Sequence, residues 1–161
     1  MIKVTNVTMA DLPAVVAIER AGFSPAEAGT PAAFRDRIAK LGDTFLVAKD
    51  GSRIVGFIVG PATGDEFVTD EMYERTPSSL PSGGHQLVLS IAVAPGCRGQ
   101  GVGSQLLAAL EKVARARQRT TISLDSLARN VPFYLANGFE QVGVSDSSHA
   151  EETWYHLVKK L

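Results

Sequence analysis

Apolar and polar residues follow two different periods along this chain, and together they predict alternating strands and helices. Short runs rich in β-branched and aromatic residues predict strands over 2–5, 44–49, 53–60, 87–93, 120–124, 139–144 and 153–158. Apolar residues at helical spacing, with capping residues and early prolines, predict helices over 11–22, 30–41, a segment from about 103, and 130–136. The longest irregular stretch is 61–84, and we expect a short helix within 65–75.

One stretch joins a strand, a glycine-rich loop and a helix in direct succession. Pro95-Gly96 ends the strand, and the loop 98–103 reads Arg-Gly-Gln-Gly-Val-Gly. Glycines allow the backbone to turn tightly and to approach a ligand, and the first N–H groups of a helix have no helical partner. With the helix dipole, such a loop forms an anion site suited to a pyrophosphate, to which Arg98 adds positive charge.

The same loop has alternative interpretations. A glycine-rich connector before a helix can be purely structural. The dinucleotide-binding pattern needs G-x-G-x-x-G after the first strand, whereas here the glycines are spaced G-x-G-x-G in the middle of the chain. A P-loop needs Gly-Lys-Ser/Thr, which the loop lacks.

Composition narrows the class of protein. The 161 residues are 45% hydrophobic and 20% charged, which predicts one globular domain over residues 1–161. The net charge of −1 gives no basic field for nucleic acid or a membrane surface. Cys97 is the single cysteine, so no disulfide forms within the chain. Without a signal-like segment or a run approaching ~18 apolar residues, we expect a cytoplasmic protein; no metal site is predicted.

Two motifs resemble those of a known family. R-G-x-G-x-G, after a strand ending in A-V-x-P and before an S-x-L-L-x-x-L helix, resembles motif A of the GCN5-related N-acetyltransferases (GNAT). The segment 131–139 resembles the F-Y-x-x-x-G-F hallmark of that family. The resemblance implies an α/β fold, with a mixed, mostly antiparallel sheet of about seven strands, splayed central strands and helices on both faces. It also implies acetyl-coenzyme A as the acetyl donor.

Nearly all the chain from about Leu12 resembles the arylalkylamine (serotonin) N-acetyltransferase branch, through segments 18–23, 29–31, 83–85, 131–134 and 139–143. Carried over by position, Tyr134 is a candidate acid for the departing thiolate. Phe23 and Trp154 become two aromatic walls of the amine pocket. The coenzyme positions are Ile91, Ala92, Val93, Arg98, Gly99, Gln100, Gly101, Val102, Gly103, Ser104, Asn130 and Phe133.

The chain departs from this branch at the proton relay. Leu87 and Leu89 occupy the positions of two histidines in the animal enzymes, so that relay does not carry over. Water or His85, the nearest histidine to the central strand, could remove the amine proton instead, although an ordinary loop histidine is the favoured interpretation of His85. Backbone N–H groups of 91–93 are candidate donors to the thioester carbonyl.

Other side chains admit two interpretations each. The acidic residues of the long excursion could attract a cationic amine or form a solvated helix face; these are Glu66, Asp70, Glu71 and Glu74. Cys97 could in principle carry an acetyl group, but a small residue filling the turn is favoured, because the family transfers the acetyl group directly.

The sequence therefore predicts an N-acetyltransferase that moves acetyl from acetyl-coenzyme A to a primary amine of a small molecule, either arylalkylamine-like or a polyamine. The alternatives are acetylation of a peptide N-terminus or lysine, and a coenzyme A-binding module without catalysis. The expected partner is the small amine, with no nucleic acid and no membrane, and a homodimer is left open.

Overall fold

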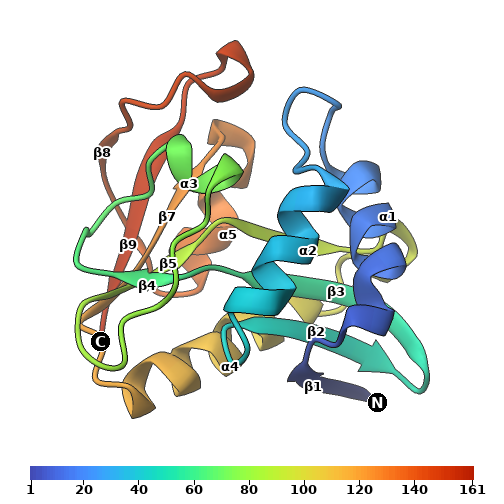
Figure 1. Cartoon of the computed structure of the whole chain (residues 1–161). Helices are drawn as coiled ribbons and strands as arrows, with labels where there is room; N and C mark the ends of the chain where they lie inside the picture. Colours follow the sequence, from blue (N-terminus) through green and yellow to red (C-terminus); the bar gives the residue numbers. More distant parts are fainter.

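Nine strands form two sheets in the computed structural model, which describes residues 1–161 (Figure 1). In chain order the elements are β1 (Ile2–Asn6), η1 (Met9–Asp11), α1 (Leu12–Gly22), α2 (Pro31–Lys40), β2 (Phe45–Asp50), β3 (Arg53–Val59), β4 (Ala62–Thr63), α3 (Glu71–Glu74), β5 (His85–Val88), β6 (Ser90–Val93), η2 (Pro95–Cys97), α4 (Val102–Ala116), β7 (Thr121–Ser126), η3 (Ala128–Asn130), α5 (Val131–Ala136), β8 (Glu140–Val144), η4 (His149–Glu151) and β9 (Tyr155–Lys160). The first sheet has the order β1-β2-β3-β6, and the second has β4-β5-β7-β9-β8.

All neighbouring strands are antiparallel except β5 and β7, which run parallel. The expected mixed, mostly antiparallel α/β fold is confirmed, with its strands divided between two sheets. The short strand β4 falls inside the stretch expected to be irregular. The helix expected within 65–75 is confirmed as the short α3.

The expected central strand 87–93 is broken at Leu89 into β5 and β6. β5 pairs with β7 up to Val88, whereas β6 pairs only with β3. At the break the N–H of Leu89 donates to the carbonyl oxygen of Val59 at 2.8 Å, so the segment crosses from one sheet to the other there. β7 continues past its last partner on β5 to Asp125 and Ser126. A wedge therefore opens between β6 and the end of β7.

Helices cover both faces of the first sheet. In Figure 1, α1 and α2 lie in front of it. Phe34 of α2 packs against Phe45 and Phe57, with ring centroids 6.3 and 5.5 Å away. A Cβ on the adjacent Gly56 would instead lie 3.2 Å from side chains of α4, so α4 covers the opposite face. Neighbouring residues of a strand point to opposite faces of the sheet, so Phe57 and Gly56 contact helices on opposite sides. The apolar layers on the two faces hold in place the elements that border the wedge.

Local signals account for the helix boundaries. The hydroxyl of Thr30 accepts a hydrogen bond from Ala33 N at 3.1 Å, and Pro31 follows at the first helical position of α2. Thr8 and Asp11 form a capping box before α1, as their spacing predicts. None of the helices combines the length and the apolar character needed to cross a bilayer.

Candidate active site

Two cavities of about 440 and about 610 Å³ meet at the wedge. The larger follows the glycine-rich loop and the start of α4, and we call it the loop cavity. The smaller is lined by α1, α2, β6, the end of β7 and the segment before β9, and we call it the acidic cavity. Four residues line both cavities: Phe23, Ile91, Asn130 and Tyr134. A reaction between ligands of the two cavities would take place at these four residues.

The loop cavity has the backbone geometry of an anion cradle. Gly99 and Gly101 have φ of +76° and +81°, which favour glycine, and no atom lies within 4 Å of a Cβ built on either. Packing within the chain therefore does not fill the space above these two glycines. Gly103 has a different role, because a Cβ there would lie 2.9 Å from the ring of Phe133.

The start of α4 provides free donors. The first helical bond of α4 runs from Gln105 N to the carbonyl oxygen of Gly101, at 3.1 Å. The N–H groups of Val102, Gly103 and Ser104 precede it and have no backbone partner. Arg98 also lines this cavity, as does Arg129, which no sequence motif indicated. These groups fit the pyrophosphate of a coenzyme.

The edge of β6 that faces the wedge has no strand partner. Ala94 N donates to the carbonyl oxygen of Val55 on β3. Because backbone polar groups point to alternate edges along a strand, those of Ala94 and Ala92 face β3. The polar backbone groups of Ile91 and Val93 therefore face the wedge. The carbonyl oxygen of Val93 accepts a bond from Arg98 Nε at 3.2 Å rather than one from β3. An extended ligand with amide groups could pair with this edge.

Most of the predicted coenzyme positions line the loop cavity. These are Ile91, Ala92, Val93, Arg98, Gly99, Gly101, Val102, Gly103, Ser104, Asn130 and Phe133. Gln100 is exposed within the same loop and does not line the cavity. Cys97 also lines it, as a buried residue of the turn before the loop.

Five carboxylates and one guanidinium line the acidic cavity, which gives it its electrostatic character. The acids are Glu19, Glu27, Asp36, Glu74 and Asp125, and the guanidinium is that of Arg37. Aromatic rings of Phe23, Tyr73, Tyr134 and Trp154 complete much of the wall. A cation with an apolar body suits this combination of groups.

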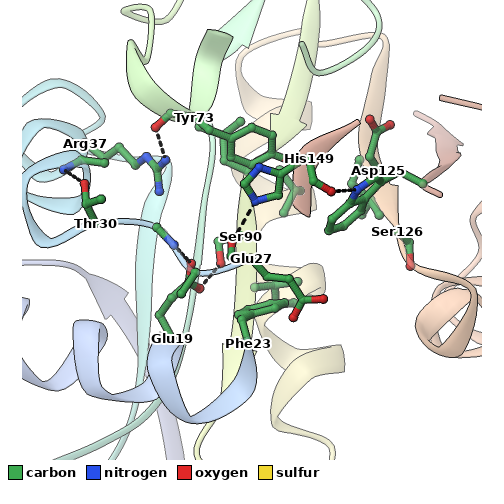
Figure 2. A pocket seen from close by; sticks show the side chains of 18 of the residues that line it. Glu19, Phe23, Glu27, Thr30, Arg37, Tyr73, Ser90, Asp125, Ser126 and His149 are labelled. Atoms are coloured by element: carbon green, nitrogen blue, oxygen red, sulfur yellow. Dashed lines mark hydrogen bonds between the residues drawn. The ribbon is translucent and has the colours of Figure 1, made fainter. Parts of the chain in front are cut away.

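Glu19 is the most deeply buried carboxylate of the acidic cavity, with 4% of its surface exposed. Its Oε1 accepts a hydrogen bond from Ser90 Oγ at 2.6 Å, and its Oε2 accepts one from Gly29 N at 2.8 Å (Figure 2). Burial raises the pKa of Glu19, and these two bonds together with the charge of Arg37 oppose that rise. Glu19 is therefore a carboxylate with strengthened basicity that faces a cavity.

Arg37 is fully buried behind Glu19, with 1% of its surface exposed. Its Nη2 donates to the carbonyl oxygen of Tyr73 at 2.8 Å, and its Nε donates to Thr76 Oγ1 at 3.2 Å. Its guanidinium carbon lies 4.9 Å from the ring centroid of Phe34. Burial lowers the pKa of Arg37, and the charge of Glu19 opposes this effect. Arg37 thus connects α2 to the α3 region and stabilises the charge of Glu19.

Tyr134 lies at the junction of the two cavities. This position agrees with the hallmark motif, which made Tyr134 a candidate acid beside the reacting thioester. Its ring packs edge-on against Phe133 and Phe139, with centroids 5.1 and 5.7 Å away. Its hydroxyl forms no hydrogen bond within the chain, and burial raises the pKa of Tyr134 above its ordinary value of 10. The tyrosine is therefore a protonated donor at neutral pH, more weakly acidic than a thiol.

Phe23 and Trp154 are also brought to the site. Both line the acidic cavity, and Phe23 continues into the loop cavity. Trp154 is buried and donates from Nε1 to the carbonyl oxygen of His149 at 2.9 Å. It lies just before β9, not within a strand as the sequence pattern indicated.

His85 is not brought to the site. It begins β5 and its Nδ1 lies 2.7 Å from Thr121 Oγ1, at the opposite end of that strand from the break at Leu89. It lines neither cavity. The two leucines at the relay positions, Leu87 and Leu89, both belong to a small apolar cluster with Val68 and Met72, and only Leu89 also lines the acidic cavity.

Several site residues carry no sequence motif. Among the acids of the excursion 61–84, Glu74 lines the acidic cavity, and Asp70 accepts bonds from Ser147 and Ser148 instead. Asp125 accepts bonds from His156 Nδ1 at 2.6 Å and Ser145 Oγ at 2.7 Å, and burial raises its pKa. The sequence held one signal for Asp125: the polar pair Asp125-Ser126 comes directly after the predicted β-branched strand 120–124.

The family model of the acetyltransferase (GNAT) domain matches residues 42–141. The chain belongs to this family. No curated protein matches it. Acetyl-coenzyme A is accordingly the acyl donor, and the free N–H groups and the open glycine turn of the loop cavity fit its pyrophosphate.

Solved structures share the fold at low sequence identity. The loading GNATL domain of CurA from Lyngbya majuscula has a TM-score of 0.82 and 15% identity, covering 99% of this chain and 98% of that chain. Ard1 from Thermoplasma volcanium has a TM-score of 0.77 and 21% identity, and the match covers 99% of this chain and 97% of that chain. The ribosomal-protein-S18-alanine N-acetyltransferase from Escherichia coli has a TM-score of 0.72 and 18% identity, and the match covers 99% of this chain and 94% of that chain. At these identities the similarity concerns the fold alone, so the acceptor has to be inferred from the site.

Proposed function

We propose that this acetyltransferase acetylates the primary amine of a small molecule that carries an apolar, arylalkylamine-like body. One observation carries the proposal: a cavity walled by carboxylates and aromatic rings opens onto the loop cavity at Tyr134 and Phe23. An alkylammonium is attracted by the carboxylates, and its apolar body can lie against the rings. A volume of about 440 Å³ falls within the usual size of small-molecule sites.

Glu19 is the proposed base. An alkylamine must lose a proton before it can attack a carbonyl group, and the raised pKa of Glu19 suits it to accept that proton. The hydroxyl of Ser90, 2.6 Å from Oε1, offers a relay between the amine and the carboxylate. Glu19 and Ser90 thus replace the absent histidine pair, and His85 has no part in this step.

Tyr134 and the edge of β6 are the proposed groups on the donor side. Acetyl-coenzyme A supplies an acetyl thioester when bound. The free hydroxyl of Tyr134 holds a proton at the junction and can donate it, or a hydrogen bond, to the leaving sulfur. The backbone N–H groups of Ile91 and Val93 face the wedge and are candidate donors to the carbonyl oxygen, which gains negative charge during transfer.

Two other acceptor classes follow from the same cavity. The carboxylates also suit a polyamine; Asp36 and Glu27 already pair with Lys40 and Arg129, whereas Glu74 has no cationic partner and could receive an additional ammonium group. A peptide N-terminus carries a single ammonium group and would extend its chain out of the cavity. A cytoplasmic location and a homodimer remain predictions from sequence.

The test is thiol release from acetyl-coenzyme A with tryptamine, phenethylamine, spermidine, tetra-alanine amide or no acceptor. We expect kcat/KM to be highest for the two arylalkylamines, with a modest preference for tryptamine over spermidine. Phe23→Ala should lower that preference, because it removes an aromatic wall worth about 0.5–2 kcal/mol. A tryptamine-to-spermidine ratio below one, or one that Phe23→Ala leaves unchanged, would exclude the aromatic-pocket model. Turnover with the peptide alone would favour peptide acetylation.

A further inference from the structure

The segment 145–154, between β8 and β9, reaches across the acidic cavity to Glu27 through His149 and through Glu152, whose carboxyl group hydrogen-bonds with that of Glu27. The Nε2 of His149 lies 3.0 Å from the carbonyl oxygen of Glu27, in the loop between α1 and α2. A carbonyl oxygen can only accept, so Nε2 is the donor. Both segments lie at the same end of the molecule, the top of Figure 1, and Figure 2 shows the imidazole bridging toward Glu27. This contact joins parts of the chain that are 122 residues apart.

The imidazole also contacts two aromatic rings. It stacks on Tyr73 with a centroid distance of 5.2 Å and an interplanar angle of 13°. The ring of Trp154 is tilted against it, with a centroid distance of 5.8 Å and an interplanar angle of 48°. All three rings line the acidic cavity, and none of them lines the loop cavity. They therefore belong to the part of the acidic cavity that the loop cavity does not share, which we call its remote end.

The backbone around His149 is held by further bonds. Its carbonyl oxygen accepts the bond from Trp154 Nε1, and the preceding Ser147 bonds to Asp70. Ala150 and Glu151, which follow it, both have φ of 56°. For residues other than glycine this left-handed conformation costs about 1–3 kcal/mol each and persists only where surrounding contacts enforce it. The turn is thus built to hold His149 in place.

We infer that His149 determines acceptor specificity by closing the remote end of the acidic cavity, which limits acceptors to those that end inside it. A short amine fits between this closure and Tyr134. A polypeptide bound by its N-terminus must continue outward, and the Tyr73–His149–Trp154 stack, tied to Glu27, obstructs that path. The inference rests on the proposed function, since it explains why a small amine is preferred over a peptide.

The experiment compares kcat/KM for tryptamine with that for tetra-alanine amide in the full chain. His149→Ala removes the ring and opens the remote end, so the tryptamine-to-peptide ratio should fall by roughly 10-fold or more, as differences in pocket fit do. His149→Phe loses the bond to Glu27 but keeps a ring beside Tyr73 and Trp154, and the bulk of this ring should retain the wild-type ratio to within about threefold. Asp146→Ala, an exposed change in the same segment, is the matched control.

The outcomes separate the two proposals. If wild type prefers tryptamine and His149→Ala keeps that ratio, with wild-type coenzyme affinity and melting temperature, the closure by His149 is wrong while the proposed function stands. If His149→Ala does not fold, His149→Ser takes its place, because it also removes the ring: an unchanged ratio in that variant overturns the inference. If wild type itself prefers the peptide, the proposed function fails first.

Discussion

Two buried carboxylates on different elements, Glu19 of α1 and Asp125 of β7, give the acidic cavity most of its chemistry. Burial raises the pKa of both, but their partners differ. Asp125 accepts bonds from His156 and Ser145, so both of its oxygens are occupied by side chains. Glu19 is held by a backbone N–H and by the mobile proton of a hydroxyl, Ser90. Of the two, Glu19 is better placed to exchange a proton with a bound amine.

Replacement of Glu19 by Gln should lower turnover roughly 100-fold or more, because the amide cannot accept the proton. In wild type, kcat/KM should fall as the pH drops through the raised pKa of Glu19, above the ordinary glutamate value of about 4.3. Glu19→Gln should lack this acidic limb. Glu74→Gln, an exposed change in the same cavity, is the control for the general field. An unchanged acidic limb in Glu19→Gln would assign the base elsewhere.

Replacement of Tyr134 by Phe removes one oxygen and keeps the ring contacts with Phe133 and Phe139. If the hydroxyl donates to the leaving sulfur, turnover should fall on the order of 100-fold while the affinity for coenzyme A stays the same. Calorimetry and single-turnover rates separate these two quantities. Wild-type turnover in Tyr134→Phe, with chemistry shown to limit the rate, would remove Tyr134 from the mechanism.

At the scale of elements, local patterns predicted most of the strands and helices but not the break in the central strand. The run from Leu87 to Val93 is apolar except for Ser90, which is typical of a strand buried on both faces. Nothing in that run marks Leu89, where pairing passes from β7 to β3. The break depends on which strands lie on either side, and this is decided by contacts distant in sequence. Only the family resemblance implied splayed strands.

The same difference separates the two halves of the site. The coenzyme half is encoded within one continuous motif, so the predicted loop residues, apart from Gln100, line the loop cavity. The acceptor half combines side chains from α1, α2, the α3 region, β7 and the segment before β9. Arg37 and His149 lie in ordinary local surroundings, Glu19 lies in the segment 18–23 without a role assigned to it, and only the tertiary fold brings the three together. The sequence therefore indicated Phe23 and Trp154 by resemblance and Glu74 by its charge, but gave no role to Glu19, Arg37 or His149.

The whole molecule consists of two sheets that share one segment, and the two cavities lie where the sheets separate. Ile91 and Val93 belong to the first sheet, whereas Asn130, Phe133 and Tyr134 follow β7 of the second. A ligand in the loop cavity would therefore contact both halves. Binding to the folded state alone stabilises it by mass action, so coenzyme A should raise the resistance of the whole chain to unfolding.

At a coenzyme A concentration 100 times its Kd, the stabilisation is about 2.7 kcal/mol. For a chain of this length, that corresponds to a rise in Tm of roughly 5–11 °C. Gly101→Val should show a clearly smaller rise at the same concentration, measured against its own ligand-free Tm. The reason is that a β-branched residue strains φ of +81° and occupies the open space above the turn. Gly96→Ala, in the preceding turn with no atom near its Cβ and no positive φ, should respond like wild type. An equal rise in Gly101→Val would mean that the glycine turn does not bind the coenzyme.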